Sequence, residues 1–162
     1  MTTAAFPFPM VNLLRYAGRS SQDSQDPVLN LIQDTSKDFE LPASRQRKKE
    51  AIDSVMDAYA ESRQAGEVAP ISERTCHETI DFLKKLPSTL PIPEVILEPN
   101  GDLALEWFVS NYYSFLVGFS GKGIITYAGL FGRGQKTYGT ELVSEAIPSS
   151  VVENIRRVLS CG

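Results

Sequence analysis

The chain has 162 residues, of which 42% are hydrophobic and 22% are charged, close to the averages of globular proteins. Its 16 basic and 20 acidic residues give a net charge of −4, which argues against a protein that coats nucleic acid. No apolar run approaches the roughly 18 residues of a membrane helix. The two distant cysteines argue against a disulfide framework, and the first residues make a poor signal peptide, so we expect a soluble cytoplasmic protein.

Residues 1–43 have the composition of a flexible arm. A polar, turn-rich stretch over residues 20–27 separates two short apolar clusters, and it would hardly offset the entropy lost on ordering. One interpretation is a loosely packed tail, and the other is a peptide-like arm that becomes ordered on a partner protein. The side chains predicted to contact that partner are Phe6, Phe8, Leu13, Leu14, Leu29 and Ile32.

Two helices are predicted next, over residues 44–64 and 72–86. In the first, apolar residues recur with helical spacing, Ser44 is a plausible N-cap and Gly66 follows the last turn. In the second, lysines near the C-terminus complement the helix dipole and Pro87 ends the helix.

A four-stranded antiparallel meander is predicted over residues 91–131, because apolar and aromatic residues alternate there between turn signals. Its strands are expected over residues 94–98, 103–108, 112–119 and 124–131. The pair Asn100-Gly101 indicates a type I′ hairpin turn, in which both residues need a positive φ. Both faces of the sheet carry apolar residues, so we expect both to be partly covered, one of them by the helices.

A last helix is predicted over residues 151–159, where Ser150 and Glu153 have the spacing of a capping box. The order of elements is a flexible arm, two helices, a meander and a helix. This order predicts an α+β fold, with residues 44–162 forming a single domain.

Few residues of this chain suit catalysis or metal binding. His77, the only histidine, directly follows Cys76, and neighbours on a helix point about 100° apart, so the two cannot form an ordinary dyad. We expect Cys76 to be buried and His77 to lie on the helix flank. One histidine and two distant cysteines are too few for zinc, and we predict no metal and no cofactor.

Residues 129–139 have the composition of a glycine-rich loop after the last strand. Such a loop with two cations can hold phosphate in backbone nests, but its spacing matches neither a Walker A loop nor a dinucleotide fingerprint. Glu106 would have a raised pKa and need a cationic partner if it were buried, and a structural salt bridge or an exposed position is the alternative. The residues of this candidate ligand site are Glu106, Arg133, Gln135, Lys136 and Tyr138.

The one dense basic cluster comprises Arg45, Arg47, Lys48 and Lys49. It lies at a predicted helix N-terminus, where the dipole disfavours each cation by about 0.3–1 kcal/mol. A phosphate or an acidic protein surface would compensate this arrangement. Alternatively, the helix begins later and these residues are solvated linker.

Several motifs are distributed over residues 90–160: Pro93-Glu94-Val95, Gly101 with Leu105-Glu106-Trp107, the run Tyr127-Ala128-Gly129-Leu130-Phe131-Gly132, and Gly139-Thr140-Glu141. With the terminal helix, they resemble a family of small uncharacterised bacterial α+β proteins associated with mobile elements. The resemblance includes no catalytic residue. It implies a bacterial or phage-related cytoplasmic protein, one half of a two-gene system.

We therefore predict a non-enzymatic protein-binding module, antitoxin-like or an immunity or phage-defence accessory protein, whose partner is a protein encoded by an adjacent gene. The first alternative is an enzyme of unfamiliar type that uses Glu106, Tyr127, Arg133 and Tyr138 around a small pocket. The second is a nucleic-acid accessory protein that uses the basic cluster. A homodimer through an edge strand of the meander is compatible with each of these functions.

Overall fold

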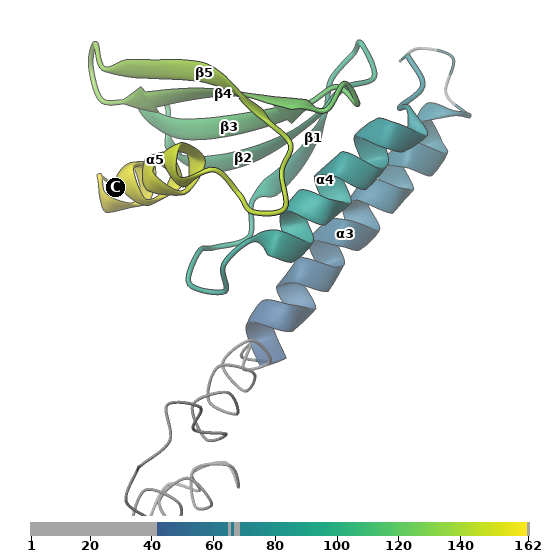
Figure 1. Ribbon diagram of the computed structural model, residues 1–162, viewed down its shortest axis with the longest axis horizontal. Coiled ribbons are helices and arrows are strands. Elements are labelled where there is room, and N and C mark those ends of the chain that lie inside the picture. Colours follow the sequence, from purple (N-terminus) through teal and green to yellow (C-terminus); the bar gives the residue numbers. More distant parts are fainter. Residues whose placement is uncertain (1–41, 65, 67–68, 162) are drawn as a thin grey trace, which may run out of the picture. The chain divides into compact units, whose positions relative to one another are not determined.

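The computed structural model describes residues 42–64, 66 and 69–161 (Figure 1). The predicted arm contacts from Phe6 to Ile32 lie outside these residues. The elements are α3 (Pro42–Ser62), α4 (Glu73–Lys85), β1 (Glu94–Leu97), β2 (Leu103–Ser110), β3 (Tyr113–Phe119), β4 (Ile124–Phe131), β5 (Lys136–Leu142) and α5 (Ser149–Ser160). The fold is α+β, with two helices before an antiparallel meander and one after it, which confirms the predicted class.

The sheet has five strands in the order β1-β2-β3-β4-β5, and not the predicted four. The fifth strand covers residues that we expected in a glycine-rich loop, and it pairs with β4 from Ile124↔Leu142 to Leu130↔Lys136. The prediction missed β5 because this strand lacks the apolar alternation that marks a half-buried strand. Neither face of β5 is fully buried, so polar residues are tolerated on both.

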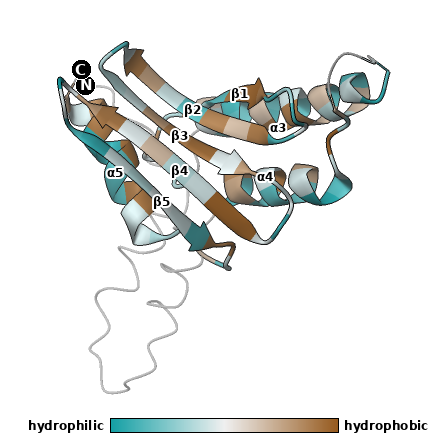
Figure 2. Ribbon diagram, turned by 90° about the horizontal axis from the view of Figure 1, so that it is seen from above, coloured by the Kyte–Doolittle hydropathy of each residue, from teal (hydrophilic) through white to brown (hydrophobic). Residues whose placement is uncertain are grey.

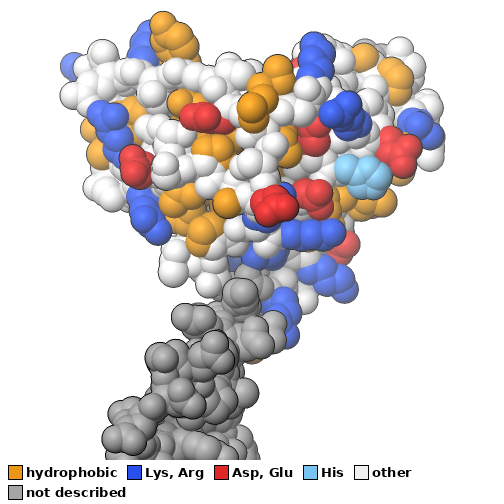
Figure 3. Space-filling view, viewed as in Figure 1, with side chains coloured by type: hydrophobic (Ala, Val, Ile, Leu, Met, Phe, Trp, Pro, Cys, Tyr) orange, Lys and Arg blue, Asp and Glu red, His pale blue; other side chains and the backbone are white. Residues whose placement is uncertain are grey.

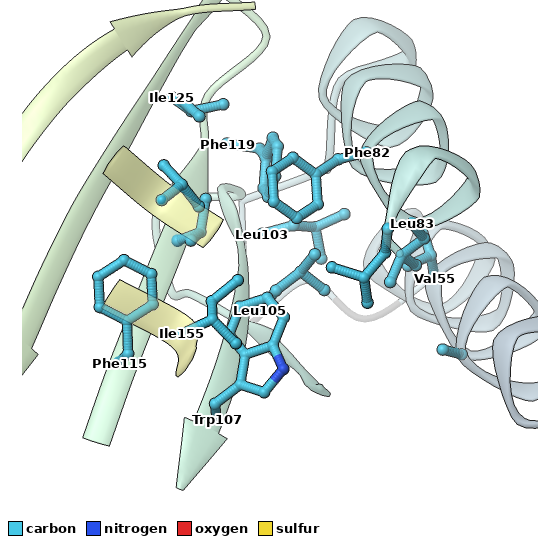
Figure 4. Packing of buried hydrophobic residues seen from close by; sticks show 14 of the residues in the cluster. Val55, Phe82, Leu83, Leu103, Leu105, Trp107, Phe115, Phe119, Ile125 and Ile155 are labelled. Atoms are coloured by element: carbon cyan, nitrogen blue, oxygen red, sulfur yellow. The ribbon is translucent and has the colours of Figure 1, made fainter. Parts of the chain in front are cut away.

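All described helices lie on one face of the sheet (Figures 1 and 2). The expectation that both faces are partly covered is therefore wrong for the described residues. Alternate residues of the three central strands point toward the helices and form the core, as Figure 4 shows from close by. The fully or nearly buried members are Leu103, Leu105, Trp107, Phe115, Val117, Phe119, Ile125 and Phe131.

The core joins the sheet to both helical parts of the fold. On α4, the Phe82 ring meets Phe119 edge to face, with the ring centroids 5.3 Å apart. From α5, Val151, Ile155 and Val158 are fully buried against the sheet. Burial of such side chains stabilises the fold by roughly 1.5–3 kcal/mol each.

Glycines with a positive φ shape the β1–β2 and β3–β4 turns. At the β1–β2 turn only Gly101 has a positive φ, of 84°, so the predicted type I′ turn is wrong. Instead, the Asn100 side-chain oxygen accepts a hydrogen bond from the Asp102 N–H at 3.1 Å. At the β3–β4 turn, Gly121 has φ 72°, and a Cβ there would lie 2.8 Å from the hydroxyls of Ser72 and Thr75. This turn therefore packs closely against the start of α4.

At the start of α3 and α5, the predicted helix caps are wrong. Because α3 begins at Pro42, Ser44 lies inside the first turn and is not the N-cap. The helix α5 follows Pro148 without a side-chain cap, and Ser150 Oγ instead donates a hydrogen bond to Glu141 Oε1 at 3.0 Å. The predicted capping box is wrong because this hydroxyl ties α5 to β5. By contrast, Ser72 does cap α4, accepting from the Thr75 N–H.

Because Phe119 lies on the helix face of the sheet and Phe108 on the open face, replacing each by alanine should affect stability differently. Phe119→Ala should lower the free energy of unfolding by about 3–5 kcal/mol, because it opens a cavity beneath the helices. Phe108→Ala, on the open face where the ring is 58% exposed, should change it by about 0.5 kcal/mol or less. Urea denaturation of both variants measures the difference, and equal losses would contradict the assignment.

Candidate functional site

The predicted ligand residues do not converge on one site. Glu106 lies on β2 and Tyr138 on β5, with β3 and β4 between them. Both point to the open face, whereas Tyr127 points to the helix face and packs on Phe115, with ring centroids 5.9 Å apart. The pocket required by the enzyme hypothesis is therefore not formed by Glu106, Tyr127 and Tyr138.

The expected glycine-rich loop is a short turn. Gly132 and Gly134 both have φ 89°, and the chain between them reverses directly into β5. The Arg133 guanidinium lies 5.6 Å from the Tyr112 ring centroid. Gln135 accepts a hydrogen bond from Arg157 Nη2 at 2.7 Å. Both polar side chains thus have contacts within the chain, and ligand binding by this turn stays a prediction.

The neighbours Cys76 and His77 lie as predicted. Cys76 is 4% exposed, and burial, with a smaller effect of the nearby Glu73 charge, raises the pKa of its thiol. His77 is exposed, and the pale-blue side chain in Figure 3 lies at the surface. Among residues 42–64, 66 and 69–161, no group of three or more histidine, cysteine, aspartate or glutamate side chains could hold a metal ion.

The basic cluster at the start of α3 has structural contacts. The alternative that the helix begins after these residues is wrong, because α3 already begins at Pro42. Lys48 Nζ donates to the backbone oxygens of Leu86 at 3.1 Å and Lys84 at 3.4 Å. Lys48 thus satisfies carbonyls at the C-terminal end of α4, where a cation is favoured.

A groove beside β1 brings two carboxylates together. Glu94 on β1 and Glu106 on β2 lie directly opposite each other in the register. The groove has a volume of about 340 Å³ and is lined by Pro91, Ile92, Glu94, Glu106, Trp107, Phe108 and Leu159. Trp107 Nε1 donates a hydrogen bond to the Pro91 oxygen at 2.8 Å, which holds the loop that forms one wall. We refer to it as the acidic groove.

The acidic groove places two negatively charged residues opposite each other on neighbouring strands. Like charges directly opposite each other on neighbouring strands are destabilising. Within the described part of the chain, the ion pairs are Arg74–Glu78 and Lys84–Asp81, so neither groove carboxylate has a cationic partner. A guanidinium or ammonium placed between Glu94 and Glu106 would relieve the repulsion and form charge-assisted hydrogen bonds.

An apolar strip adjoins the groove on the open face of the sheet. The register places four apolar residues on this face: Phe108 on β2, Leu116 on β3, Leu130 on β4 and Tyr138 on β5. Phe108 and Tyr138 are 58% and 86% exposed. Figure 2, which looks onto this face, shows no described helix crossing it.

The buried carboxylate of Glu78 was not predicted from the sequence. Glu78 on α4 is 8% exposed, and its Oε1 accepts a hydrogen bond from the Gly123 N–H at 2.9 Å. Arg74 Nε approaches the same oxygen at 3.4 Å. This side chain joins α4 to the β3–β4 turn. Its burial could have been predicted from its position in the sequence. Glu78 lies in an i, i+4 row between Arg74 and Phe82, next to the apolar stripe of α4.

The chain matches no protein-family model, no curated protein sequence and no solved structure. The resemblance of residues 90–160 to bacterial proteins associated with mobile elements thus stays a prediction. Of the described helices, none has the length and apolar character to cross a membrane.

The role of Glu78 can be tested by stability measurements. Glu78→Ala removes the acceptor of the Gly123 N–H and should lower the free energy of unfolding by about 1–3 kcal/mol. Glu78→Gln retains an acceptor oxygen and should cost less, since the Arg74 side chain is 70% exposed and its ion pair contributes little. Asp81→Ala, an exposed carboxylate of the same helix, is the control and should change stability by about 0.5 kcal/mol or less. Equal losses for Glu78→Ala and Asp81→Ala would contradict this role.

Proposed function

We propose that this protein is a non-enzymatic protein-binding module, and that its partner inserts an arginine or lysine side chain into the acidic groove. The observation that carries the proposal is the unpaired, directly opposed pair Glu94 and Glu106, in a groove that also has aromatic and aliphatic walls. An arginine suits this environment best, because its planar guanidinium can bond a carboxylate in two places and stack on a ring.

The apolar strip supports a protein as the partner, rather than a small cation. An isolated cation would use the two carboxylates but not Phe108, Leu116, Leu130 and Tyr138. Protein interfaces combine exposed aromatic anchors at their centre with polar groups at the rim. Glu94 and Glu106 of the acidic groove point to the same open face as the apolar strip, and Phe108 belongs to both, so a single partner surface can contact them together.

The charge pattern disfavours nucleic acid as the partner on this face. The groove carries two negative charges, and the whole chain has a net charge of −4, so a phosphate backbone would be repelled. Acidic and basic side chains are also interspersed over the side shown in Figure 3. The resemblance of residues 90–160 predicts one particular kind of protein binding. It predicts an antitoxin-like, immunity or phage-defence role, with the partner encoded by an adjacent gene.

The proposal predicts that binding and stability respond differently to the same substitution. Glu106→Gln should leave the free energy of unfolding unchanged or raise it by about 0.2–1 kcal/mol, because it removes like-charge repulsion. It should weaken partner binding by roughly tenfold or more, because a charge-assisted hydrogen bond contributes about 1.5–3 kcal/mol. The partner is first isolated by affinity capture with the tagged full-length protein from its native cells. Its dissociation constant is then measured by calorimetry.

Glu61→Gln provides the matched control. It makes the same charge change on an exposed residue of α3 and should leave the dissociation constant unchanged. Phe108→Ala, which should not affect stability, should also weaken binding. If Glu106→Gln and Phe108→Ala bind the partner as tightly as the unaltered protein, while removal of residues 1–41 abolishes binding, the arm is the binding element and the groove proposal is wrong.

A further inference from the structure

The two edges of the sheet differ in how they are protected. Edge strands present unpaired N–H and C=O groups that can template pairing with another chain, and proteins usually block them with lysines, prolines, bulges or packed elements. The β1 edge has only four residues, is bracketed by Pro93 and Pro99, and has α3 packed against it. The β5 edge has seven residues from Lys136 to Leu142 and no proline.

Among the described residues, no helix or strand covers the outer edge of β5. Its pairing with β4 is continuous and shows no bulge. The helix α5 packs on β2, β3 and β4, and no described helix or strand pairs with the outer edge of β5. In Figure 1, β5 forms the upper margin of the sheet.

The hydrogen bonds at both ends of the β4–β5 ladder determine which backbone groups are unpaired. The Phe131 N–H donates to the Gln135 oxygen at 2.9 Å, and the Val143 N–H donates to the Gly123 oxygen at 3.0 Å. Bonded and non-bonded pairs alternate in an antiparallel ladder, so the odd-numbered residues of β5 bond to β4. The even-numbered residues direct their N–H and C=O groups away from the sheet. They are Lys136, Tyr138, Thr140 and Leu142.

We propose that β5 pairs antiparallel with β5 of a second copy of this chain, about a two-fold axis at Gly139. In this register Lys136 pairs with Leu142 of the second copy, and Tyr138 pairs with Thr140 of the second copy. All four outward-directed residues then form hydrogen-bonded pairs, so the whole strand is used. The two five-stranded sheets become one continuous sheet with its open faces on the same side.

The side chains of β5 are compatible with this register. On the open face, the aliphatic stem of Lys136 covers Leu142, which is 73% exposed in the single chain. The Tyr138–Thr140 pair joins an aromatic to a β-branched residue, a favourable cross-strand combination. On the helix face, Thr137 lies opposite Glu141, so no like charges oppose each other. Because this register pairs every outward-directed residue of β5 with a compatible residue of the same strand, it favours a second copy over an unrelated strand as the occupant.

The centre of the proposed interface also suits a two-fold axis. Gly139 has no side chain, and the Tyr127 phenol occupies the position that a Cβ would take. The Tyr127 hydroxyl has no hydrogen-bond partner among the residues that the structure describes. Pairing at Gly139 brings the two Tyr127 side chains beside the axis, on the helix face of the joined sheet.

Charge-swap variants test both the dimer and its register. In Tyr138→Lys/Thr140→Lys, each lysine faces a lysine of the second copy, and the dimer dissociation constant should rise about tenfold or more. In Tyr138→Lys/Thr140→Glu, each lysine faces a glutamate, and the dimer should be retained. Both positions are exposed, so the fold tolerates the substitutions. Sedimentation equilibrium of the full-length chain, whose monomer mass is 17.9 kDa, measures each constant.

Amide hydrogen exchange gives an independent measurement on the unaltered protein. In the dimer, the amides of Tyr138 and Thr140 should be protected as strongly as those of Thr137 and Gly139, and protection of the even-numbered amides should disappear on dilution. A chain that stays monomeric at high concentration would overturn the proposal. So would a dimer that the Lys/Lys variant leaves intact, or that the Lys/Glu variant fails to retain. Tyr138 also belongs to the apolar strip, so the two tests are separated by their measurements: sedimentation of the chain alone reports the dimer, and calorimetry with the partner on Glu106→Gln reports the acidic groove.

Discussion

Burial of one face of the meander is the interaction on which the rest of the structure depends. The residues that point toward the helices in β2 and β3, such as Leu105, Phe115 and Val117, are fully buried. They pack against α4 from before the sheet and α5 from after it, which fixes the two helical parts on the same side. Because side chains alternate along a strand, this choice also determines which residues face outward.

The proposed functional surfaces follow from that one-sided arrangement. Helices on one face leave Phe108, Leu116 and Leu130 on the other, next to the opposed carboxylates Glu94 and Glu106. Likewise, α3 packs against β1 at one edge, whereas nothing described pairs beyond β5 at the other. The face that we propose for a partner protein and the edge that we propose for a second copy meet at Tyr138 of β5. A dimer would present two acidic grooves on one continuous sheet.

The candidate site illustrates why named residues are easier to predict than their grouping. Glu106, Lys136 and Tyr138 were all singled out from the sequence, and all three do lie on the open face. They were grouped as one ligand site because a buried Glu106 would need a cationic partner, which the glycine-rich segment with Arg133 and Lys136 could supply. In the sheet, β3 and β4 lie between Glu106 on β2 and the other two residues on β5. The register instead pairs Glu106 with Glu94. Strand register is a non-local property, and local composition carries little information about it.

The sequence by itself determined the α+β class, the helix boundaries to within a few residues and four of the five strands, because these depend on hydrophobic periodicity and on local signals such as Pro87. It also correctly predicted a buried Cys76 beside an exposed His77. Only the tertiary structure decided that the helices cover one face, that residues 136–142 form a strand, and that Glu78 is buried against a distant turn. These features depend on which segments meet in space, and a polar strand such as β5 is stabilised by the backbone of β4 rather than by a pattern in its own side chains.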